Sequence, residues 1–105
     1  MSVINRTFKS ATTGMVTIYT VPSGKSAVIT SLNHCNYNSA SGIVYTYIEN
    51  SGNFGTINNI NDLAPNASIE IIGSGQKLVL NAGDKLRFYK QYSNVDSIVT
   101  LMEID

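Results

Sequence analysis

The most reactive side chains in this sequence are its one histidine and its one cysteine, which are neighbours as His34 and Cys35. A nucleophile and its base must lie on the same side of the backbone, whereas adjacent residues of a β-strand point to opposite faces. This pair therefore does not predict a cysteine nucleophile. A serine hydrolase stays open in principle among twelve serines, but no Gly-x-Ser-x-Gly elbow supports it. We expect a protein that is not an enzyme.

Metal and cofactor chemistry has little support in the sequence. The carboxylates do not occur at metal-ligand spacing, and the segment from Asn58 to Asp62 lacks the acidic density of a calcium loop. A single cysteine forms neither an intramolecular disulfide nor a thiolate metal cluster. Gly73 and Gly75 are not followed by the Lys-Ser/Thr pair and helix of a phosphate-binding loop. We predict no metal and no cofactor.

The balance of charge narrows the choice of partners. Seven basic and seven acidic residues give a net charge of zero, and the basic residues are scattered, so we expect no nucleic-acid binding. The sequence has no run of 18 apolar residues that could span a bilayer. Its first residues lack a secretory signal, so we expect synthesis in the cytoplasm. Ser, Thr and Asn supply 33 of the 105 residues, so most of the polar side chains are uncharged and do not indicate a charged partner.

The elements that position these residues are predicted to be β-strands. Ile, Val and Thr contribute 29 residues, and turn-forming residues recur every eight to twelve positions. We predict an all-β protein, a single antiparallel β-sandwich domain over residues 1–105 with a jelly-roll-like arrangement of about eight strands. The predicted strands are Arg6–Ala11, Met15–Thr20, Lys25–Asn36, Ile43–Glu49, Ser68–Ile72, Lys77–Leu80, Lys85–Gln91 and Ser97–Ile104.

Two turns are expected to set the register of long hairpins. In the first, Pro22 fixes φ at the first central position and Gly24 takes the left-handed conformation. In the second, which precedes Asp84, Asn81 bonds the turn backbone and Gly83 supplies the positive φ. We expect both turns to serve folding rather than binding.

The segment Asn50–Asn66 differs from the rest of the chain. It contains six asparagines, and only Phe54, Ile57, Ile60 and Leu63 could anchor it. We predict a long surface loop, with one helix-like turn near Asn61 that Pro65 ends. Long loops in compact domains are often functional, although a loop without a role remains the alternative.

Several strands have no polar face, which predicts an interaction surface. Alternation places Tyr45 and Tyr47 opposite Val44, Thr46 and Ile48, although a sandwich buries only one face of each sheet. Tyrosine gives contact area at a low entropic cost. We predict a subunit or partner interface that contains Tyr45, Tyr47, Tyr89 and Tyr19. Alternatively, loops of the same chain cover this face.

The segment Ile18–Leu32, which continues to Cys35 and Asn36, resembles small structural proteins of tailed bacteriophages. In that group a Y-T-V-P-x-G-K turn leads into a strand that closes on C-N. The later L-x-A-G-D-x-L pattern is matched by Leu80–Leu86, and the chain finishes on a strand that ends at Ile104. The resemblance covers most of the chain outside Asn50–Ser74.

The resemblance implies a non-enzymatic β-sandwich of the virion, such as a capsid decoration or cement protein. This sequence departs from the pattern at His34, where an apolar residue is expected. His34 is either partly buried and bonded to a backbone carbonyl, or located at a subunit contact that protonation near pH 6 would weaken.

Two functions remain open at this point. The first is a capsid decoration protein that binds the major capsid protein and forms a homo-oligomer, with a trimer favoured, on the surface of a virion made in the bacterial cytoplasm. The second is a tail, neck or fibre module that binds a virion partner or carbohydrate. For a glycan, the expected contacts are Tyr37, Phe54 and Tyr92 for stacking and Asn58, Asn59 and Asn61 for hydroxyl groups.

Overall fold

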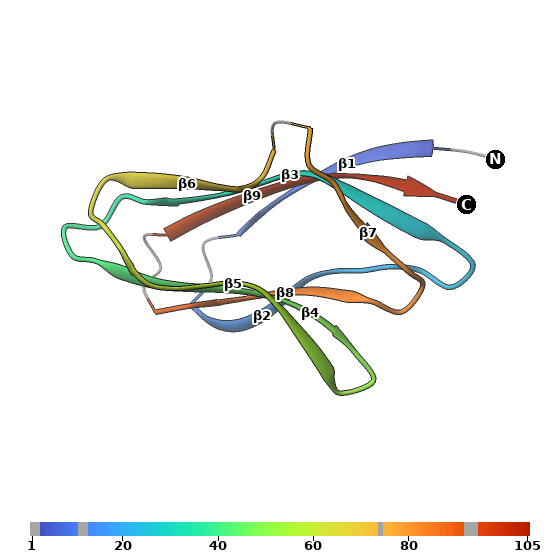
Figure 1. The fold of residues 1–105 in the computed structure, drawn as a ribbon, viewed down its shortest axis with the longest axis horizontal. Coiled ribbons are helices and arrows are strands. Elements are labelled where there is room, and N and C mark those ends of the chain that lie inside the picture. The colour runs from blue at the N-terminus through green and yellow to red at the C-terminus, as the bar shows by residue number, and fades with distance from the viewer. Residues whose placement is uncertain (1–2, 11–12, 74, 92–94) are drawn as a thin grey trace.

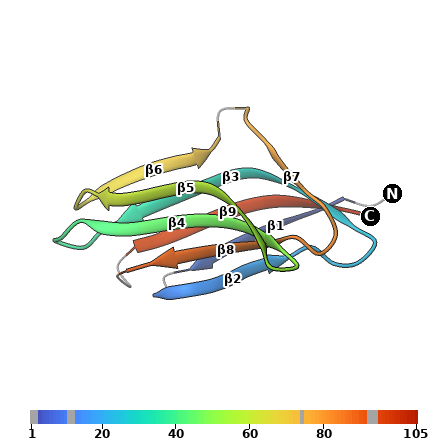
Figure 2. The same cartoon turned by 60° about the horizontal axis from the view of Figure 1, so that its bottom comes forward.

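The computed structural model describes residues 3–10, 13–73, 75–91 and 95–105. Two antiparallel sheets lie face to face (Figures 1 and 2). The first, here the β1 sheet, has the order β1 (Val3–Ser10), β9 (Val95–Ile104), β3 (Ser26–Asn36), β6 (Ala67–Ile72), with β7 (Leu78–Leu80) also paired to β3. The second, here the β2 sheet, has the order β2 (Gly14–Thr20), β8 (Lys85–Lys90), β4 (Gly42–Asn50), β5 (Asn53–Leu63).

With the short β7 set aside, this is the strand order of a jelly roll, so the predicted fold class is confirmed. All eight predicted strands are present with shifted ends; Ala11, the predicted end of the first, lies outside the described residues. The described part of the chain contains no helix with the length and apolar character needed to cross a bilayer.

The core lies between the two sheets and follows the alternation of the strands. In β9 the buried positions are Val95, Ser97, Val99, Leu101 and Glu103, while the residues between them face outward. From the other side, Leu86 and Phe88 of β8 are buried against them. Burial of alternate residues from both sheets is the main source of stability in a sandwich of this kind.

The prediction of a long loop at Asn50–Asn66 is wrong, because most of this segment forms β5. Asn50 pairs with Asn53, and Ser51 and Gly52 between them have φ values of 52° and 84°, as a two-residue type I′ hairpin turn requires. β5 lies at the edge of the β2 sheet, where none of the described strands pairs with its outer side and polar residues are tolerated. The predicted helical turn near Asn61 is also wrong, since Asn61 belongs to this strand.

The two turns do not close hairpins as predicted, because each of them joins one sheet to the other. The first connects β2 to β3 and the second connects β7 to β8. Gly24 has a φ of 77° and Gly83 a φ of 88°, which confirms the left-handed glycines. Lys25 N donates to Pro22 O at 3.2 Å, so Pro22 is the first residue of the turn rather than its first central residue. The turn therefore begins one residue later in the chain than predicted.

The two connections are also bonded to each other. Gly83 N donates to Val21 O at 3.0 Å, and Val21 N donates to Asp84 O at 2.9 Å. Within the second turn it is the side chain of Asp84 that accepts from Asn81 N, at 2.8 Å, rather than the Asn81 side chain as predicted. Asp84 also accepts from Asn50 Nδ2 at 2.8 Å, which fixes the β4–β5 hairpin to the same end of the sandwich.

Candidate interaction surface

A row of four aromatic rings crosses the outer side of the β2 sheet and is called here the aromatic face. Tyr89 and Tyr45 are stacked with ring centroids 5.7 Å apart. Tyr45 meets Tyr47 edge-on at 6.2 Å, and Tyr47 meets Phe54 edge-on at 5.8 Å. These separations are typical of favourable aromatic pairs. The predicted grouping of Tyr45, Tyr47 and Tyr89 on one face is therefore observed, and Phe54 joins it.

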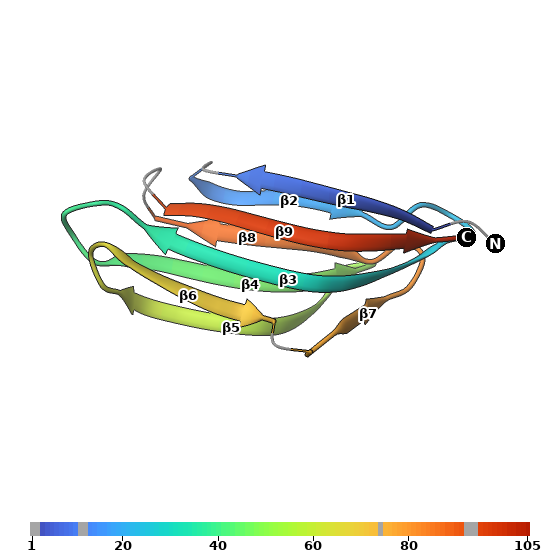
Figure 3. The same cartoon turned by 90° about the horizontal axis from the view of Figure 1, so that it is seen from above.

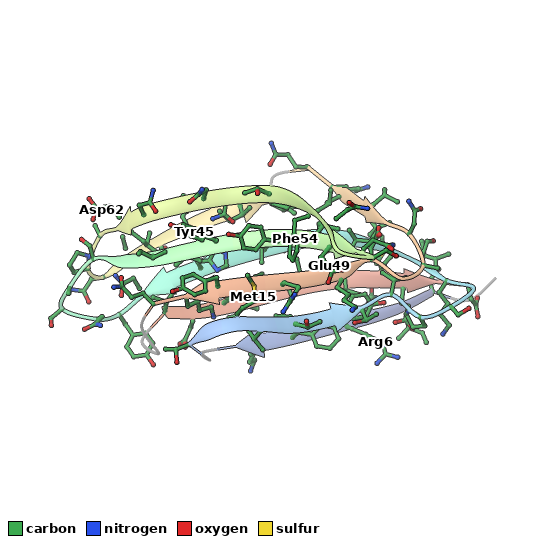
Figure 4. All side chains as sticks on the ribbon, turned by 90° about the horizontal axis from the view of Figure 1, so that it is seen from below. Arg6, Met15, Tyr45, Glu49, Phe54 and Asp62 are labelled. Carbon is green, nitrogen blue, oxygen red and sulfur yellow. The ribbon has the colours of Figure 1, made fainter. Side chains whose placement is uncertain are left out.

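Strand register explains how rings from three strands meet. Tyr45 of β4 is paired with Tyr89 of β8, which is in turn paired with Met15 of β2. Paired residues of neighbouring strands share a face, so these side chains form one line across the sheet. Figure 4 shows Met15, Tyr45 and Phe54 on the side that faces the viewer. Phe54 is 53% exposed and Met15 is 43% exposed, so no part of the described chain covers them.

One carboxylate beside the rings is shared by two cations. Glu49 is 7% exposed and lies 3.8 Å from Lys85 Nζ and 3.7 Å from Arg87 Nη1, and it accepts from Gly52 N at 3.0 Å. The Arg87 guanidinium also lies over the Phe54 ring, 5.9 Å from its centroid. The aromatic face is therefore framed by a fixed cluster of charges.

The asparagines of β5 divide between its two sides. The Tyr45 hydroxyl donates to Asn61 Oδ1, and Asn59 is paired with Tyr45, so both border the aromatic face. Asn58 points the other way, and its Nδ2 donates to Val44 O at 3.0 Å. Of the predicted loop residues, Phe54, Asn59 and Asn61 thus gather on one face, whereas Asn58 does not join them.

The remaining aromatic candidates lie elsewhere. Tyr37 is 52% exposed in the connection between β3 and β4. Tyr92 lies outside the described residues.

Tyr19 is a structural residue, and its predicted place in an exposed interface is wrong. It is 7% exposed, and its hydroxyl donates to Glu103 Oε2 at 2.6 Å. Lys25 Nζ lies 3.2 Å from Glu103 Oε1, and Arg6 Nε lies 3.4 Å from Oε2. The hydrogen bond from Tyr19 is the largest cause that holds the pKa of Glu103 below its ordinary value, and the positive charges of Lys25 and Arg6 lower this pKa further. A bulge in β2 between Thr17 and Tyr19 accompanies this inward orientation.

His34 is also internal, and neither of the two predicted locations is correct. It is fully buried, its Nδ1 lies 2.5 Å from Ser97 Oγ, and its Nε2 lies 2.9 Å from Thr46 Oγ1. Ser97 belongs to the neighbouring strand β9, while Thr46 belongs to the opposite sheet. The imidazole therefore bonds two hydroxyl groups and links the two sheets through the core.

The surroundings of His34 disfavour its charged form. Burial lowers the pKa of His34 to about 4, and the positive charge of Lys90 contributes further, against a smaller opposing effect of the Asn58 amide. The Phe88 ring packs edge-on against the imidazole with centroids 5.2 Å apart. His34 is thus neutral at physiological pH.

The described residues offer no cluster suited to a metal ion. They contain no group of three His, Cys, Asp or Glu side chains placed to hold a metal ion. A shallow groove of about 360 Å³ lies between the β5 edge and the β6–β7 edge, and its lining is Ile57, Ile72, Gln76, Lys77 and Leu78. Lys77 is the one charged side chain among them and no carboxylate or histidine joins it, so the aromatic face is the better candidate for function.

Sequence reasoning missed two contributors to this face. The composition of Asn50–Asn66 predicts a loop at Phe54, and the signal that indicates a strand there is the Ser51-Gly52 pair, a two-residue hairpin turn. The other is Met15, whose exposure follows from the outward direction of alternate residues in β2, an edge strand.

Comparison with known proteins supports the fold. No protein-family model matches the sequence, and no curated protein sequence matches it. The structure is similar to the nucleoplasmin-like N-terminal domain of Drosophila FKBP39, with a TM-score of 0.55 and 13% identity over 98% of this chain and 90% of that one. This similarity concerns the sandwich architecture.

A weaker likeness joins the chain to two structures of a pentameric capsid protein isolated from metagenomic phage sequences. Each has a TM-score of 0.45 at 17% identity. The matches cover 98% and 93% of this chain, but the chain spans only 60% of the length of each capsid protein.

Proposed function

We propose that this chain is a non-enzymatic structural protein of a phage virion that decorates or cements the capsid surface, having been made in the host cytoplasm. The observation that carries the proposal is the aromatic face, a row of four rings on the solvent side of a sheet whose other side already faces the core. The turn patterns at Tyr19–Lys25 and Leu80–Leu86, which resemble those of small phage structural proteins, support a virion setting.

The composition of the aromatic face suits a protein partner. Tyrosine and arginine are enriched in the energetically dominant parts of protein interfaces, and Arg87 lies over Phe54 within this row. Glu49 offsets one of the two positive charges of Lys85 and Arg87, so the cluster beside the rings keeps one net positive charge. We assign the major capsid protein to this face, with many copies each covering a junction of the lattice.

The proposal is tested with capsids that lack the protein. Tyr47→Asp places a charge in the centre of the row, and we expect it to abolish sedimentation of the protein with capsids while its far-ultraviolet spectrum stays that of a β-protein. Ser23→Asp is the matched control, because Ser23 is exposed in the turn between β2 and β3 and none of the four rings belongs to that turn, so this variant should bind as the wild type does. Binding by Tyr47→Asp at wild-type affinity would refute this assignment.

The number of copies per virion separates a capsid from a tail position. Hundreds of copies are expected for a decoration protein, and six or twelve would indicate the tail or neck instead. The sequence favoured a trimer, and sedimentation equilibrium of the purified protein gives the oligomeric state.

A second candidate function, carbohydrate binding by a tail or fibre module, is favoured by one observation. Asn59 and Asn61 border the stacked rings, and planar amides beside aromatic faces suit a polar, uncharged sugar. Phe54→Ala would then remove binding on a glycan array, with Tyr37→Ala as the control away from this face. Absence of any signal from the wild-type protein would exclude the glycans tested.

A further inference from the structure

The outer side of the β1 sheet is a second solvent-facing surface with apolar residues, called here the second face. Its apolar members lie mainly toward the end of the sheet where β1 begins and β9 ends. Val79 is 62% exposed, Val3 51% and Ile98 44%, while Val28, Met102 and Ile104 are half-buried. Figure 3 views the molecule from this side and shows β1, β9, β3 and β6 side by side. The core and the aromatic face account for none of these side chains.

Register arranges the second face into rows that run across the strands. One row reads Asn5, Met102, Val28 and Val79, from β1 through β9 and β3 to β7. Another reads Lys9, Ile98, Asn33 and Glu70, from β1 through β9 and β3 to β6. The second row therefore carries a positive charge at the β1 edge and a negative charge at the β6 edge.

We infer that two copies of this chain pair through their second faces, around a two-fold axis that runs parallel to the strands between β9 and β3. Rotation about this axis reverses the order of each row, so each row of one copy lies over the same row of the other copy in the opposite direction. Lys9 of each copy then faces Glu70 of the other, and Met102 faces Val28. The pairing is isologous, so one patch supplies both halves of the interface.

The geometry tolerates the twist of the sheets. Strands about 4.8 Å apart put Lys9 and Glu70 about 7 Å from the axis, and stacked sheets cross at about 30°. This crossing shifts the two side chains relative to each other by about 4 Å along the axis, a shift that the flexible lysine side chain can span. A two-fold axis perpendicular to the strands would instead place the apolar end of each face over the polar end near Asp96 and Cys35, so that arrangement is disfavoured.

The dimensions of the face are adequate for a stable pair. The molecule extends 45 Å along the strands and 19 Å across them, so a copy that covers the whole face buries about the 800 Å² per partner of a standard interface. Residues 75–77, which lead into β7, rise above one edge of the face in Figure 1, but they do not lie over the centre in Figure 3. The zero net charge removes general repulsion between identical copies.

This pair replaces the trimer that the sequence favoured, and it leaves both aromatic faces pointing outward. It does not depend on the capsid role, because the aromatic face and the second face lie on opposite sides of the sandwich. Loss of capsid binding by Tyr47→Asp and loss of pairing are therefore separate outcomes.

Cys35 provides a native probe of the arrangement, because it is exposed and belongs to the second face through its pairing with Asp96 and Ser68. Across the proposed axis the sheet spacing alone holds the two Cys35 Cα atoms about 10 Å or more apart. This is too far for a disulfide but suits a short bis-maleimide reagent. We expect the reagent to give a covalent dimer at micromolar protein, whereas mild oxidation without it gives none. Cys35→Ser is the control that must give no product.

Charge reversal then tests the register. Lys9→Glu alone and Glu70→Lys alone each create two repulsive pairs, and we expect each to weaken the dimer at least tenfold in sedimentation equilibrium. The double variant Lys9→Glu/Glu70→Lys restores opposite charges and should restore the dimer, while Tyr47→Asp should pair as the wild type does. A monomeric wild type without cross-linking would overturn the pairing, and a double variant as weak as the singles would overturn the two-fold register.

Discussion

His34 makes the stability of this protein depend on pH in a window that can be isolated. The imidazole is fully buried between Ser97 and Thr46, and its pKa is lowered to about 4 from an ordinary value of 6.5. We choose His34→Gln as the perturbation, because glutamine can still bond one of the two hydroxyl groups but does not titrate.

The sign of the effect follows from proton linkage. Between pH 6.5 and pH 4 the unfolded chain binds a proton at His34 that the folded chain excludes, so the free energy of unfolding falls as the pH falls. The two pKa values differ enough to lower the wild-type free energy of unfolding by about 3 kcal/mol across this window. That is a large share of the total for a small domain.

Urea denaturation at pH 7, 5.5 and 4.5 measures the effect. Two other groups with shifted pKa values change the free energy of unfolding outside this window. Lys90, with a pKa lowered to about 8, does so only above that pH, and Glu103, with a lowered pKa, does so only below its ordinary value of 4.5. We expect His34→Gln to be less stable than the wild type at pH 7 but nearly flat from pH 6.5 to 4.5. Asn33→Gln, on the outer side of the same strand, should keep the wild-type slope. A slope retained by His34→Gln, or a folded-state His34 pKa near 6.5 by NMR titration, would refute this reasoning.

Three further predictions concern the fold. Gly83→Val should lower the free energy of unfolding by about 1–2 kcal/mol in chemical denaturation, because Gly83 has a φ of 88°, and an unchanged stability would mean that the turn adjusts. Asn36→Ala should cost about 1–3 kcal/mol, because the buried Asn36 amide donates to Ala40 O at 2.9 Å and to Leu63 O at 2.8 Å; a smaller loss would mean that water replaces it. Burial lowers the pKa of Lys90 to about 8 from 10.5, so wild-type stability should rise between pH 8 and pH 10.5 as the unfolded chain alone holds the proton. Lys90→Met should remove that rise in denaturation curves, and a variant that keeps it would show that another group titrates there.

Local patterns were sufficient to predict most of the strands and the sandwich. Period-two alternation in β4 and β8 predicts the outward direction of Tyr45, Tyr47 and Tyr89 correctly, because the direction of a strand side chain alternates along the sequence. The left-handed glycines at positions 24 and 83 followed from turn chemistry for the same reason.

The errors arose where the partner of a segment lies far away in sequence or where a strand is polar. β5 is rich in asparagine, and its strand conformation depends on hydrogen bonds to β4 rather than on its own propensity. Tyr19 bonds Glu103, and His34 bonds Ser97 and, on the opposite sheet, Thr46. Ser97 and Glu103 are more than 60 positions away, and Thr46 meets His34 only once the two sheets pack, so no local pattern could reveal that these two side chains are internal. Turn chemistry alone predicts hairpins at both turns, because a sequence does not state which sheet the next strand enters.

The position of β9 has a consequence for synthesis of the protein. Val95–Ile104 comes last in order among the strands, yet it lies between β1 and β3 and pairs with both. A ribosome has therefore produced β1 and β3 long before the strand that joins them exists, whereas β4 and β5 can pair as soon as they emerge. Closing such long loops late makes folding slow, and β1 and β3 keep unpaired edges in the meantime. Production of the protein should consequently benefit from slow expression and low temperature.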